Sequence, residues 1–467
     1  MPAEPDARLA ARALDLSSAK RVHIVGVGGA GMSAIALLLA RMGHHVSGSD
    51  IKSTPVLERL AAAGVDVHVG NRPEHVPERA DAVVYSTAVP RSNVELVTAD
   101  ARGIPVLHRS SALAALSLAR RTVAIAGSHG KTTTASMLAL ILRAAEWSPS
   151  FVIGGEVNEV GTNAAFGEGD WLVIEADESD GTFLHLFTRA ALVTNVEPDH
   201  LDHYGDFGAL VRSFEQFVDA VDGPVIVCAD DPVAARLASR ASPARTYGYA
   251  ESADYRIVDE MVDATGCHFT LVAPGPRPIA VALPAGVRAA TNASGAIAAA
   301  LELGADAAAA VRALAGFGGV ARRFQYRGER AGVTFIDDYA HLPTEVEAAI
   351  AAARQGPWRR VVVVFQPHRY TRTATIGPTF ADAFSAADVL VLTDVYAAGE
   401  TPIPGVSGRT ILGAVLDHHP ALPVAYLPKF TDLAAVPERY ARPGDLVLTL
   451  GAGDLTSMPD VWIGAAS

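Results

Sequence analysis

A short glycine-bounded turn constrains this chain more than any other feature, and its sequence is Gly127-Ser-His-Gly130-Lys131-Thr132. The apolar run 122–126 before it is typical of a buried strand, and residues 132–145 carry apolar side chains at helical spacing. A turn of this kind directs backbone N–H groups, the positive end of a helix and a lysine ammonium toward one anion. The pattern predicts a phosphate site in an α/β fold, with the Thr132 hydroxyl placed to bind Mg²⁺.

This turn is shorter than the standard phosphate loop, which requires glycine at the position of Ile125. The alternative interpretation is a strand, a turn and a helix with a lysine on the surface. Lysine is rare in this chain, because only four of its 38 basic residues are lysines. A lysine at position 131 therefore favours a functional role.

Composition limits the classes of protein to which the chain can belong. At 467 residues it is too long for a single core, so we expect two to four domains. Apolar residues make up 50% and charged residues 19%, which indicates a folded globular protein. The net charge of −13 argues against a nucleic-acid partner and favours a soluble protein of the cytoplasm.

Cysteines and apolar segments also favour a cytoplasmic protein. Cys228 and Cys267 form neither a metal-type cluster nor a disulfide framework, so a reducing compartment is expected. Residues 1–16 carry acidic side chains and lack the continuous apolar run of a signal peptide. The apolar run 34–40 is far shorter than a membrane span, so we expect no membrane partner.

A second glycine-rich turn lies near the start of the chain, between an expected strand and an expected helix. Its glycines are Gly26, Gly28 and Gly31, and Asp50 closes the next expected strand. This spacing is typical of dinucleotide sites and by itself indicates an NAD-dependent dehydrogenase. Physically it requires only a pyrophosphate at a helix N-terminus, so a sugar nucleotide fits equally well. A tight turn that packs a helix against a strand is the remaining alternative.

Two pairs of polar residues end further expected strands of this first unit. Ser86 and Thr87 close the expected strand 82–86, and His108 and Arg109 follow the expected strand 104–107. Ligands bind at the carboxyl ends of strands in open parallel sheets. Each pair is therefore a candidate for ligand binding, with a solvated loop as the alternative.

Acidic residues gather at the ends of the two expected strands that follow the lysine turn. The strand 171–174 leads into Glu175, Asp177, Glu178 and Asp180, and the strand 191–194 leads into Glu197, Asp199 and His200. Carboxylates this close repel one another unless a cation lies among them. The pattern predicts a Mg²⁺-nucleotide site assembled from separate strand ends, with a solvated acidic turn as the alternative.

The rest of the chain predicts a longer central unit and a second doubly wound sheet. We expect turns over 158–169, a β-rich insertion over 245–284 and a helix over 286–303. The last unit alternates expected strands (333–338, 360–365, 389–394, 446–450) with a helix over 343–354 and another that ends at Phe384.

Seven segments in order resemble the Mur ligases of bacterial cell-wall synthesis: 26–33, 127–134, 175–180, 197–200, 322–325, 337–345 and 368–373. The Gly-Val-Gly-Gly-Ala-Gly-Met start is similar to the alanine-adding branch of that family. The resemblance implies three α/β domains: a Rossmann-like UDP-sugar domain (1–118), a central ATPase-type mixed sheet (119–318) and a Rossmann-like acceptor domain (319–467).

The resemblance also implies a reaction. L-Alanine would be joined to the lactyl carboxylate of UDP-N-acetylmuramate, a peptidoglycan precursor, through an acyl phosphate formed from ATP with Mg²⁺. Lysine, arginine and metal are the charges that such a phosphate requires. The protein would be a monomer or a weak homodimer.

Site residues are carried over position by position. The resemblance implies an ATP site of Gly127, Ser128, His129, Gly130, Lys131, Thr132, Thr133, Asn292, Arg323 and Asp338. It implies Mg²⁺ ligands at Thr132, Glu175 and His200, with Glu178 as the alternative carboxylate. The UDP-sugar side would contain Gly28, Gly29, Gly31, Met32, Ser33, Asp50, Ser86, Thr87, His108 and Arg109, and the amino-acid side Tyr339, His341, Arg369 and Arg372. Catalysis would depend on Lys131, Glu175, His200, Arg323 and His341.

Three positions, in two motifs, depart from the family pattern. Arg288 and Ala289 replace a histidine and an asparagine that usually precede Asn292, and Leu342 replaces a second histidine. We expect activity to be retained with altered nucleotide contacts. No lysine lies between Lys131 and Lys429, so the central domain cannot use the carbamylated lysine of some relatives.

Three other functions stay open at the level of sequence. One is a ligase of the same family that recycles a muropeptide, since pocket size decides between a peptide and free alanine. The others are an NAD-dependent dehydrogenase and a degenerate homologue that binds a UDP-sugar as a sensor.

Overall fold

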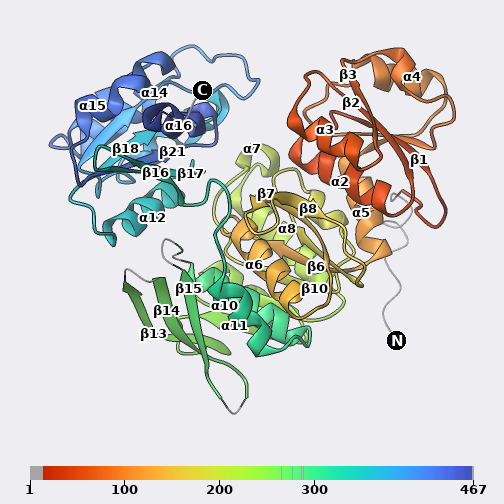
Figure 1. Ribbon diagram of the computed structural model, residues 1–467, viewed down its shortest axis with the longest axis horizontal. Coiled ribbons are helices and arrows are strands. Elements are labelled where there is room, and N and C mark those ends of the chain that lie inside the picture. Colours follow the sequence, from red (N-terminus) through yellow and green to blue (C-terminus); the bar gives the residue numbers. More distant parts are fainter. Residues whose placement is uncertain (1–13, 264–265, 276, 285–286, 288, 465–467) are drawn as a thin grey trace. The chain divides into compact units, whose positions relative to one another are not determined.

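The computed structural model describes residues 14–263, 266–275, 277–284, 287 and 289–464. Three sheets with flanking helices make up these ranges (Figure 1), which confirms the predicted α/β class. The chain divides into two compact units: the first contains the first and second sheets and ends at Gly318, and the second begins at Gly319.

The first sheet is parallel throughout and has the strand order β3-β2-β1-β4-β5. Its strands are β1 (Arg21–Val25), β2 (His45–Asp50), β3 (Asp66–Val69), β4 (Ala82–Tyr85) and β5 (Val106–His108). Its helices are α2 (Ala30–Arg41), α3 (Pro55–Ala62), α4 (Val94–Ala101) and α5 (Arg109–Ala119). β5 begins two residues later than predicted, because Pro105 has no N–H to give to the ladder.

The second sheet is mixed, as predicted, and has ten strands in the order β15-β14-β13-β12-β11-β10-β6-β9-β7-β8. Its strands are β6 (Arg121–Ala126), β7 (Ser150–Val157), β8 (Thr162–Ala165), β9 (Trp171–Glu175), β10 (Ala190–Val193), β11 (Val225–Cys228), β12 (Ala244–Gly248), β13 (Tyr255–Asp263), β14 (Gly266–Val272) and β15 (Ile279–Pro284). β6 lies between β9 and β10, so both acidic segments follow strands that flank the lysine turn.

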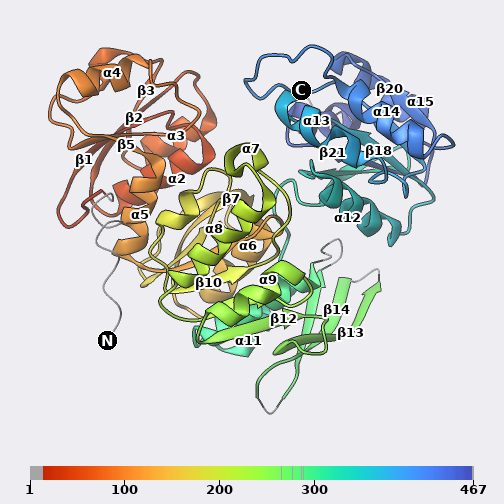
Figure 2. The same ribbon diagram turned by 180° about the vertical axis from the view of Figure 1, so that it is seen from behind.

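Helices cover both faces of this second sheet. The helices α6 (Lys131–Ala144), α10 (Ala290–Glu302) and α11 (Ala307–Ala315) pack together on one face (Figure 1). The other face carries α8 (Phe207–Asp219) and α9 (Pro232–Leu237) (Figure 2), and the short α7 (Leu201–Tyr204) precedes α8. α10 corresponds to the helix predicted over 286–303, whose residues 286 and 288 lie outside the described ranges.

Two predictions for the central unit were right only in part: 158–169 contains turns and 245–284 is rich in strands, but both segments contribute strands to the main sheet. The segment 158–169 is not only turns, because β8 forms an antiparallel hairpin with β7. The segment 245–284 is not a separate insertion: β12 pairs in parallel with β11, and β13 to β15 continue the same sheet. β8 pairs only with the strand directly before it, whereas β12 joins the sheet by pairing with β11, and strand propensity alone predicts neither pairing.

The third sheet has the order β16-β17-β21-β18-β19-β20, with only β16 antiparallel. Its strands are β16 (Gln325–Arg330), β17 (Val333–Asp338), β18 (Val361–Phe365), β19 (Val389–Leu392), β20 (Val424–Tyr426) and β21 (Leu446–Leu450). Its helices are α12 (Pro343–Arg354), α13 (Tyr370–Ile376), α14 (Gly408–His418), α15 (Val436–Tyr440) and α16 (Met458–Ile463). β18 and β21 are wholly buried, as their apolar sequences require.

The helix predicted to end at Phe384 is shorter than expected. α13 ends at Ile376, and a 3₁₀ turn, Gly377–Phe380, follows it. Pro378 lies inside that turn, and a proline cannot continue an α-helix because its ring clashes with the preceding turn. None of the helices within the described ranges is long and apolar enough to cross a membrane.

Candidate active site

The lysine turn is held in a conformation that only glycine tolerates. Gly127 has φ of 128° and Gly130 has φ of 80°, both in the left-handed region. A Cβ atom on Gly127 would collide with the Thr194 hydroxyl and lie 2.9 Å from the carbonyl oxygen of Asn195. The two glycines therefore allow the backbone to approach the neighbouring strand end closely.

The segment after β10 braces this turn. Asn195 accepts hydrogen bonds from two successive turn N–H groups: its carbonyl from Ser128 N at 3.0 Å and its Oδ1 from His129 N at 2.8 Å. The Ser128 hydroxyl accepts from Glu197 N at 2.8 Å, and His129 Nε2 lies 3.3 Å from Glu197 Oε2. The turn is therefore preformed by side chains of the adjacent strand end.

Lys131 is the first residue of α6, and its ammonium already has three protein acceptors. Nζ donates to the carbonyls of Gly127 at 2.5 Å and Ser128 at 3.2 Å, and to Glu178 Oε1 at 2.9 Å. An ammonium has only three N–H donors. A phosphate at this turn must therefore displace one of these acceptors.

Glu178 is the buried partner of this lysine. Its side chain is 2% exposed, and its Oε2 has no hydrogen-bond partner among the described residues. Burial raises the pKa of Glu178 to about 7, against the lowering effect of Lys131. The glutamate thus lies near the balance between its charged and neutral forms at neutral pH.

Two of the three predicted metal ligands touch each other. The Thr132 hydroxyl donates to Glu175 Oε1 at 3.0 Å, and Glu175 Oε2 accepts from Gly154 N at 2.6 Å. A hydroxyl and a carboxylate are oxygen donors of the kind that Mg²⁺ takes from proteins, together with phosphate and water. These two residues fit such an ion.

His200, the third predicted ligand, lies against Asp199. Its Nε2 is 3.2 Å from Asp199 Oδ2, and its backbone has φ of 53° directly before α7. Across the described ranges no three His, Cys, Asp or Glu side chains already converge as a metal site. Phosphate and water would have to complete the coordination of an ion held here.

Asn292, which was predicted to belong to the ATP site, lies on helix α10 and comes close to the lysine turn. A Cβ atom on Gly130 would lie 2.6 Å from Asn292 Oδ1, so this side chain of α10 abuts the turn. Thr133 lies half-buried in the first turn of α6. Ala289 immediately precedes α10, whereas Arg288 lies outside the described residues.

In the glycine turn near the start of the chain, a backbone N–H group is hydrogen-bonded to the acidic residue that ends the next strand. Asp50 Oδ2 accepts a hydrogen bond from Gly28 N at 2.9 Å, and a Cβ atom on Gly28 would lie 2.8 Å from that oxygen. Gly29 and Gly31 flank the start of α2, and Met32 and Ser33 are buried in its first turn. Asp50 is thus bound to the turn backbone.

The other predicted sugar-side residues follow β4 and β5. Ser86 is half-buried and Thr87 exposed. His108 Nδ1 accepts from Ser110 N at 3.3 Å, and its buried Nε2 has no hydrogen-bond partner in the described part of the chain. Burial lowers the pKa of His108. The imidazole is therefore neutral at pH 7.

Arg109 links the first sheet to the acidic segment after β9. Its Nη2 lies 2.8 Å from Asp180 Oδ2 and 3.1 Å from Asp177 Oδ2. A Cβ atom on Gly31 would lie 3.8 Å from its Nη1, so the guanidinium also lies beside the glycine turn. The four predicted acidic residues therefore divide: Asp177 and Asp180 hold Arg109, Glu178 holds Lys131, and Glu175 holds Thr132.

In the second compact unit, Asp338 organises the turn after β17. Its Oδ1 accepts from Ala340 N at 2.7 Å and its Oδ2 from Phe324 N at 2.6 Å. Burial raises the pKa of Asp338 to about 6, opposed by Arg323. The Arg323 guanidinium lies over the Tyr339 ring, 5.3 Å from its centroid.

His341 and Arg372 meet around His368. The rings of His341 and His368 are 5.9 Å apart, and Arg372 Nη1 donates to His368 Nδ1 at 3.2 Å. Burial, with His341 and the nearby arginines, lowers the pKa of His368 to about 3. His368 is therefore a neutral acceptor. Arg369, with φ of 69°, immediately precedes α13.

Several contact residues are absent from the site predicted from the sequence. Asn195 and Glu197 brace the lysine turn, and His368 and Tyr396 stack with ring centroids 5.7 Å apart. Glu345 Oε2 accepts from His341 N at 2.9 Å. The sequence could have indicated these residues by their location, because each lies just after an expected strand or at the start of an expected helix. Leu342 is buried at 4% exposure, so it contributes to packing.

Three family models match the chain in sequence. They are the Mur ligase family catalytic domain over residues 21–121, the Mur ligase middle domain over 125–300, and the Mur ligase glutamate ligase domain over 322–453.

Curated relatives match over nearly the whole length. The UDP-N-acetylmuramate–L-alanine ligase of Saccharopolyspora erythraea is 47% identical over 453 residues, covering 94% of this chain and 92% of that protein. The enzyme of the same name from an Anaeromyxobacter species is 46% identical, covering 94% and 96%.

Solved structures give the same picture. The UDP-N-acetylmuramate–alanine ligase of Thermotoga maritima matches with a TM-score of 0.78 and 27% identity, covering 96% of this chain and 99% of that one. A murein peptide ligase from Psychrobacter arcticus matches with a TM-score of 0.70 and 25% identity, covering 96% and 98%.

Proposed function

Because this chain belongs to the Mur ligase family, we propose that it joins L-alanine to the carboxylate of UDP-N-acetylmuramate with the energy of ATP. The product is a precursor of peptidoglycan, and we place the reaction in the cytoplasm. The γ-phosphoryl group of ATP passes to the lactyl carboxylate and ADP leaves. The amine of alanine then attacks the acyl carbon, and phosphate and a proton leave as the amide forms.

One observation carries this proposal: Lys131 and Thr132, which follow the glycine turn after β6, lie beside the carboxylates of Glu178, which follows β9, and Glu175, which ends it. A hydride transfer would need none of these groups. A phosphoryl transfer needs a cation at the moving phosphate and oxygen ligands for a metal.

Each group has a role in the proposal. Lys131 and the N–H groups at the start of α6 hold the phosphates, and Asn292 lies beside the turn. Thr132, Glu175 and His200 would hold Mg²⁺, which supplies charge neutralisation when bound. Glu178 stays as the alternative carboxylate. Gly28, Gly29, Gly31, Met32 and Ser33 would accept the sugar nucleotide's diphosphate, with Asp50, Ser86, Thr87, His108 and Arg109 around it.

The second compact unit would supply the amino-acid side. Tyr339, His341, Arg369 and Arg372 would bind alanine, while Arg323 and Asp338 contact ATP. The neutral His368 leaves Arg372 as a local positive charge for a carboxylate. The domains we propose are 1–118, 119–318 and 319–467, in a monomer or a weak homodimer.

The deciding experiment measures phosphate release from ATP with UDP-N-acetylmuramate and one amino donor at a time. Free L-alanine should give the fastest turnover, and glycine, L-serine and an L-alanyl-γ-D-glutamyl peptide should give less. No ADP with L-alanine would refute the proposal. Faster turnover with the peptide would favour muropeptide recycling instead.

The two remaining alternatives have their own controls. Reduced nicotinamide fluorescence should not change when protein is added, as it would with a dehydrogenase. Sugar-nucleotide binding without any ATP hydrolysis would favour a sensor.

A further inference from the structure

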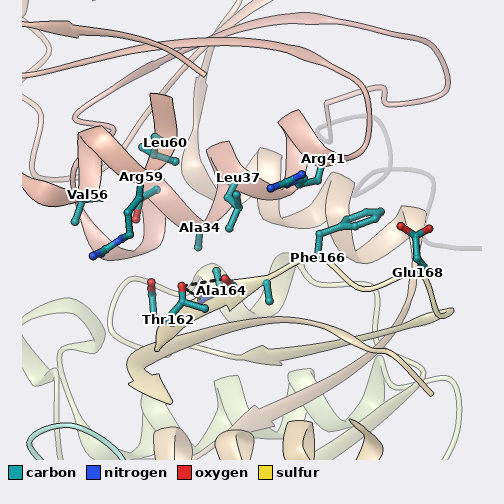
Figure 3. Close-up of a pocket in the computed structure, with 13 residues that line it drawn as sticks. Ala34, Leu37, Arg41, Val56, Arg59, Leu60, Thr162, Ala164, Phe166 and Glu168 are labelled. Carbon is teal, nitrogen blue, oxygen red and sulfur yellow. Dashed lines mark hydrogen bonds between the residues drawn. The ribbon is translucent and has the colours of Figure 1, made fainter. Parts of the chain in front are cut away.

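A hollow of about 490 Å³ lies in the first compact unit, between helices α2 and α3 and the strand β8 (Figure 3). Cavities that hold small molecules have volumes of roughly 300–1,000 Å³. The hollow is lined by residues from the first to the last turn of α2, by one side of α3 and by the segment 162–168. Ser33 is the one lining residue that the proposed function also assigns to a ligand.

Seven of the thirteen residues that line the hollow are apolar, and they come from both of its walls. Side chains of α2 and α3 form one wall, and side chains of β8 and the loop after it form the opposite wall (Figure 3). The apolar members are Ala34, Leu37, Val56, Leu60, Ala164, Ala165 and Phe166. Phe166 is half-buried, and the Arg120 guanidinium lies over its ring, 4.7 Å from the centroid.

Two arginines at the rim have no partner among the residues that the structure describes. Arg41 ends α2 and Arg59 lies on α3, both exposed, and neither guanidinium has a hydrogen bond or ion pair with any described residue. In the same unit Arg109 and Arg245 are each paired with carboxylates. In a chain of net charge −13, two free arginines beside one apolar hollow form a local positive site.

The carboxylate on the lining is placed away from one of these arginines. Glu168 lies beyond Phe166 at one end of the hollow, and Arg59 lies at the other end (Figure 3). This arrangement favours a ligand whose negative group is at the Arg59 end and whose apolar body lies over Leu37 and Phe166.

We propose that this hollow binds a small organic anion with an apolar body, such as an aryl carboxylate or sulfonate. The apolar residues supply the area, Arg59 binds the negative group, and Arg41, on the other side of Leu37, adds positive charge over the apolar body (Figure 3). The site is distinct from the lysine turn and from the acceptor side of the second unit.

The test uses two fluorescent probes with the full chain. 8-Anilinonaphthalene-1-sulfonate has the required body and charge, and N-phenyl-1-naphthylamine has the same body without the sulfonate. The variant Arg41→Gln/Arg59→Gln removes both charges from exposed positions. The control Arg79→Gln/Arg212→Gln removes two exposed arginines elsewhere on the same unit.

The sulfonate should bind at one site per chain in the wild-type protein and in the control. It should bind about tenfold more weakly to Arg41→Gln/Arg59→Gln, while the uncharged probe binds all three proteins alike. Equal sulfonate binding to variant and control would overturn the proposal. So would displacement of the dye by ATP or UDP, because the dye would then occupy a nucleotide site.

Discussion

At the scale of single residues, Lys131 and Glu178 form the central pair. The three donors of the lysine are taken by two turn carbonyls and one carboxylate, so phosphate binding requires an exchange of partners. The carboxylate is the charge-assisted acceptor, and such hydrogen bonds are stronger than those to neutral groups. Glu178 therefore opposes phosphate binding until the lysine leaves it.

Glu178→Gln should tighten ATP binding about fivefold, because a neutral amide holds the lysine less strongly by roughly 1 kcal/mol. Titration calorimetry with ATP and Mg²⁺ measures the effect. Glu156→Gln, at an exposed position on β7, is the matched control. Weaker ATP binding by Glu178→Gln would indicate that the carboxylate holds the metal or positions the lysine.

His368 makes stability depend on pH. Its pKa is about 3 in the folded chain and about 6.5 when unfolded, so the unfolded chain binds the extra proton first. Its contribution to stability is complete above pH 6.5 and is lost as pH falls toward 3, by at most about 1.4 kcal/mol per pH unit.

His368→Gln should therefore reduce the loss of unfolding free energy between pH 7 and pH 5.5. Urea denaturation at both pH values measures this difference. His45→Gln, at an exposed position, should keep the wild-type difference. An unchanged difference in His368→Gln would show that the imidazole is protonated in the folded state.

At the scale of elements, the turn between β6 and α6 depends on contact with the segment after β10. Gly127 has both a positive φ and a neighbour where a side chain would lie. Gly64, by contrast, has φ of 92° and no atom within 4 Å of the place that a Cβ atom would take. Substitutions at these two positions therefore distinguish the cost of backbone strain from the cost of steric collision.

Gly64→Ala should cost about 1 kcal/mol of unfolding free energy, from backbone strain alone. Gly127→Ala should cost at least twice as much, because the methyl group also displaces Thr194 and Asn195. Chemical denaturation measures both unfolding free energies. Equal losses in the two variants would show that the segment after β10 moves aside for the methyl group without an energetic cost.

At the scale of the whole molecule, each compact unit has its own buried core. One cluster joins the first and second sheets, and two clusters lie within the third sheet's unit. Sugar nucleotide and ATP are assigned to different sheets of the first unit. Removal of a phosphate-binding side chain at the second sheet should therefore leave sugar-nucleotide binding at the first sheet unchanged.

Lys131→Ala should lower turnover by about a thousandfold, a typical loss for a preorganised charge at a transition state. Its affinity for UDP-N-acetylmuramate in calorimetry should stay within about twofold of the wild-type value. Lys429→Ala, at an exposed lysine of the other unit, should change neither. Joint loss of turnover and sugar-nucleotide binding would contradict this division between the sheets.

Local patterns determined much of this protein. Strand periodicity and the two glycine turns predicted the parallel alternation, with Glu175 at a strand end and Lys131 and Thr132 at the start of a helix, because those features depend on near neighbours. The α12 helix begins and ends at its predicted residues. The strand order that places β9 and β10 beside β6 agrees with the predicted assembly of the site from separate strand ends.

Only the tertiary structure decided which groups pair. Lys131 and Glu178 are 47 positions apart in the chain, and Arg109 and Asp180 are 71 apart. The segment 175–180 contains four acidic residues, and its sequence does not say which of them pairs with the lysine and which with the arginine. β12 and β13 likewise join the sheet by parallel pairing with the strand before each of them, across a crossover and not a hairpin turn. Such pairings depend on burial and geometry across the fold, which no local pattern contains.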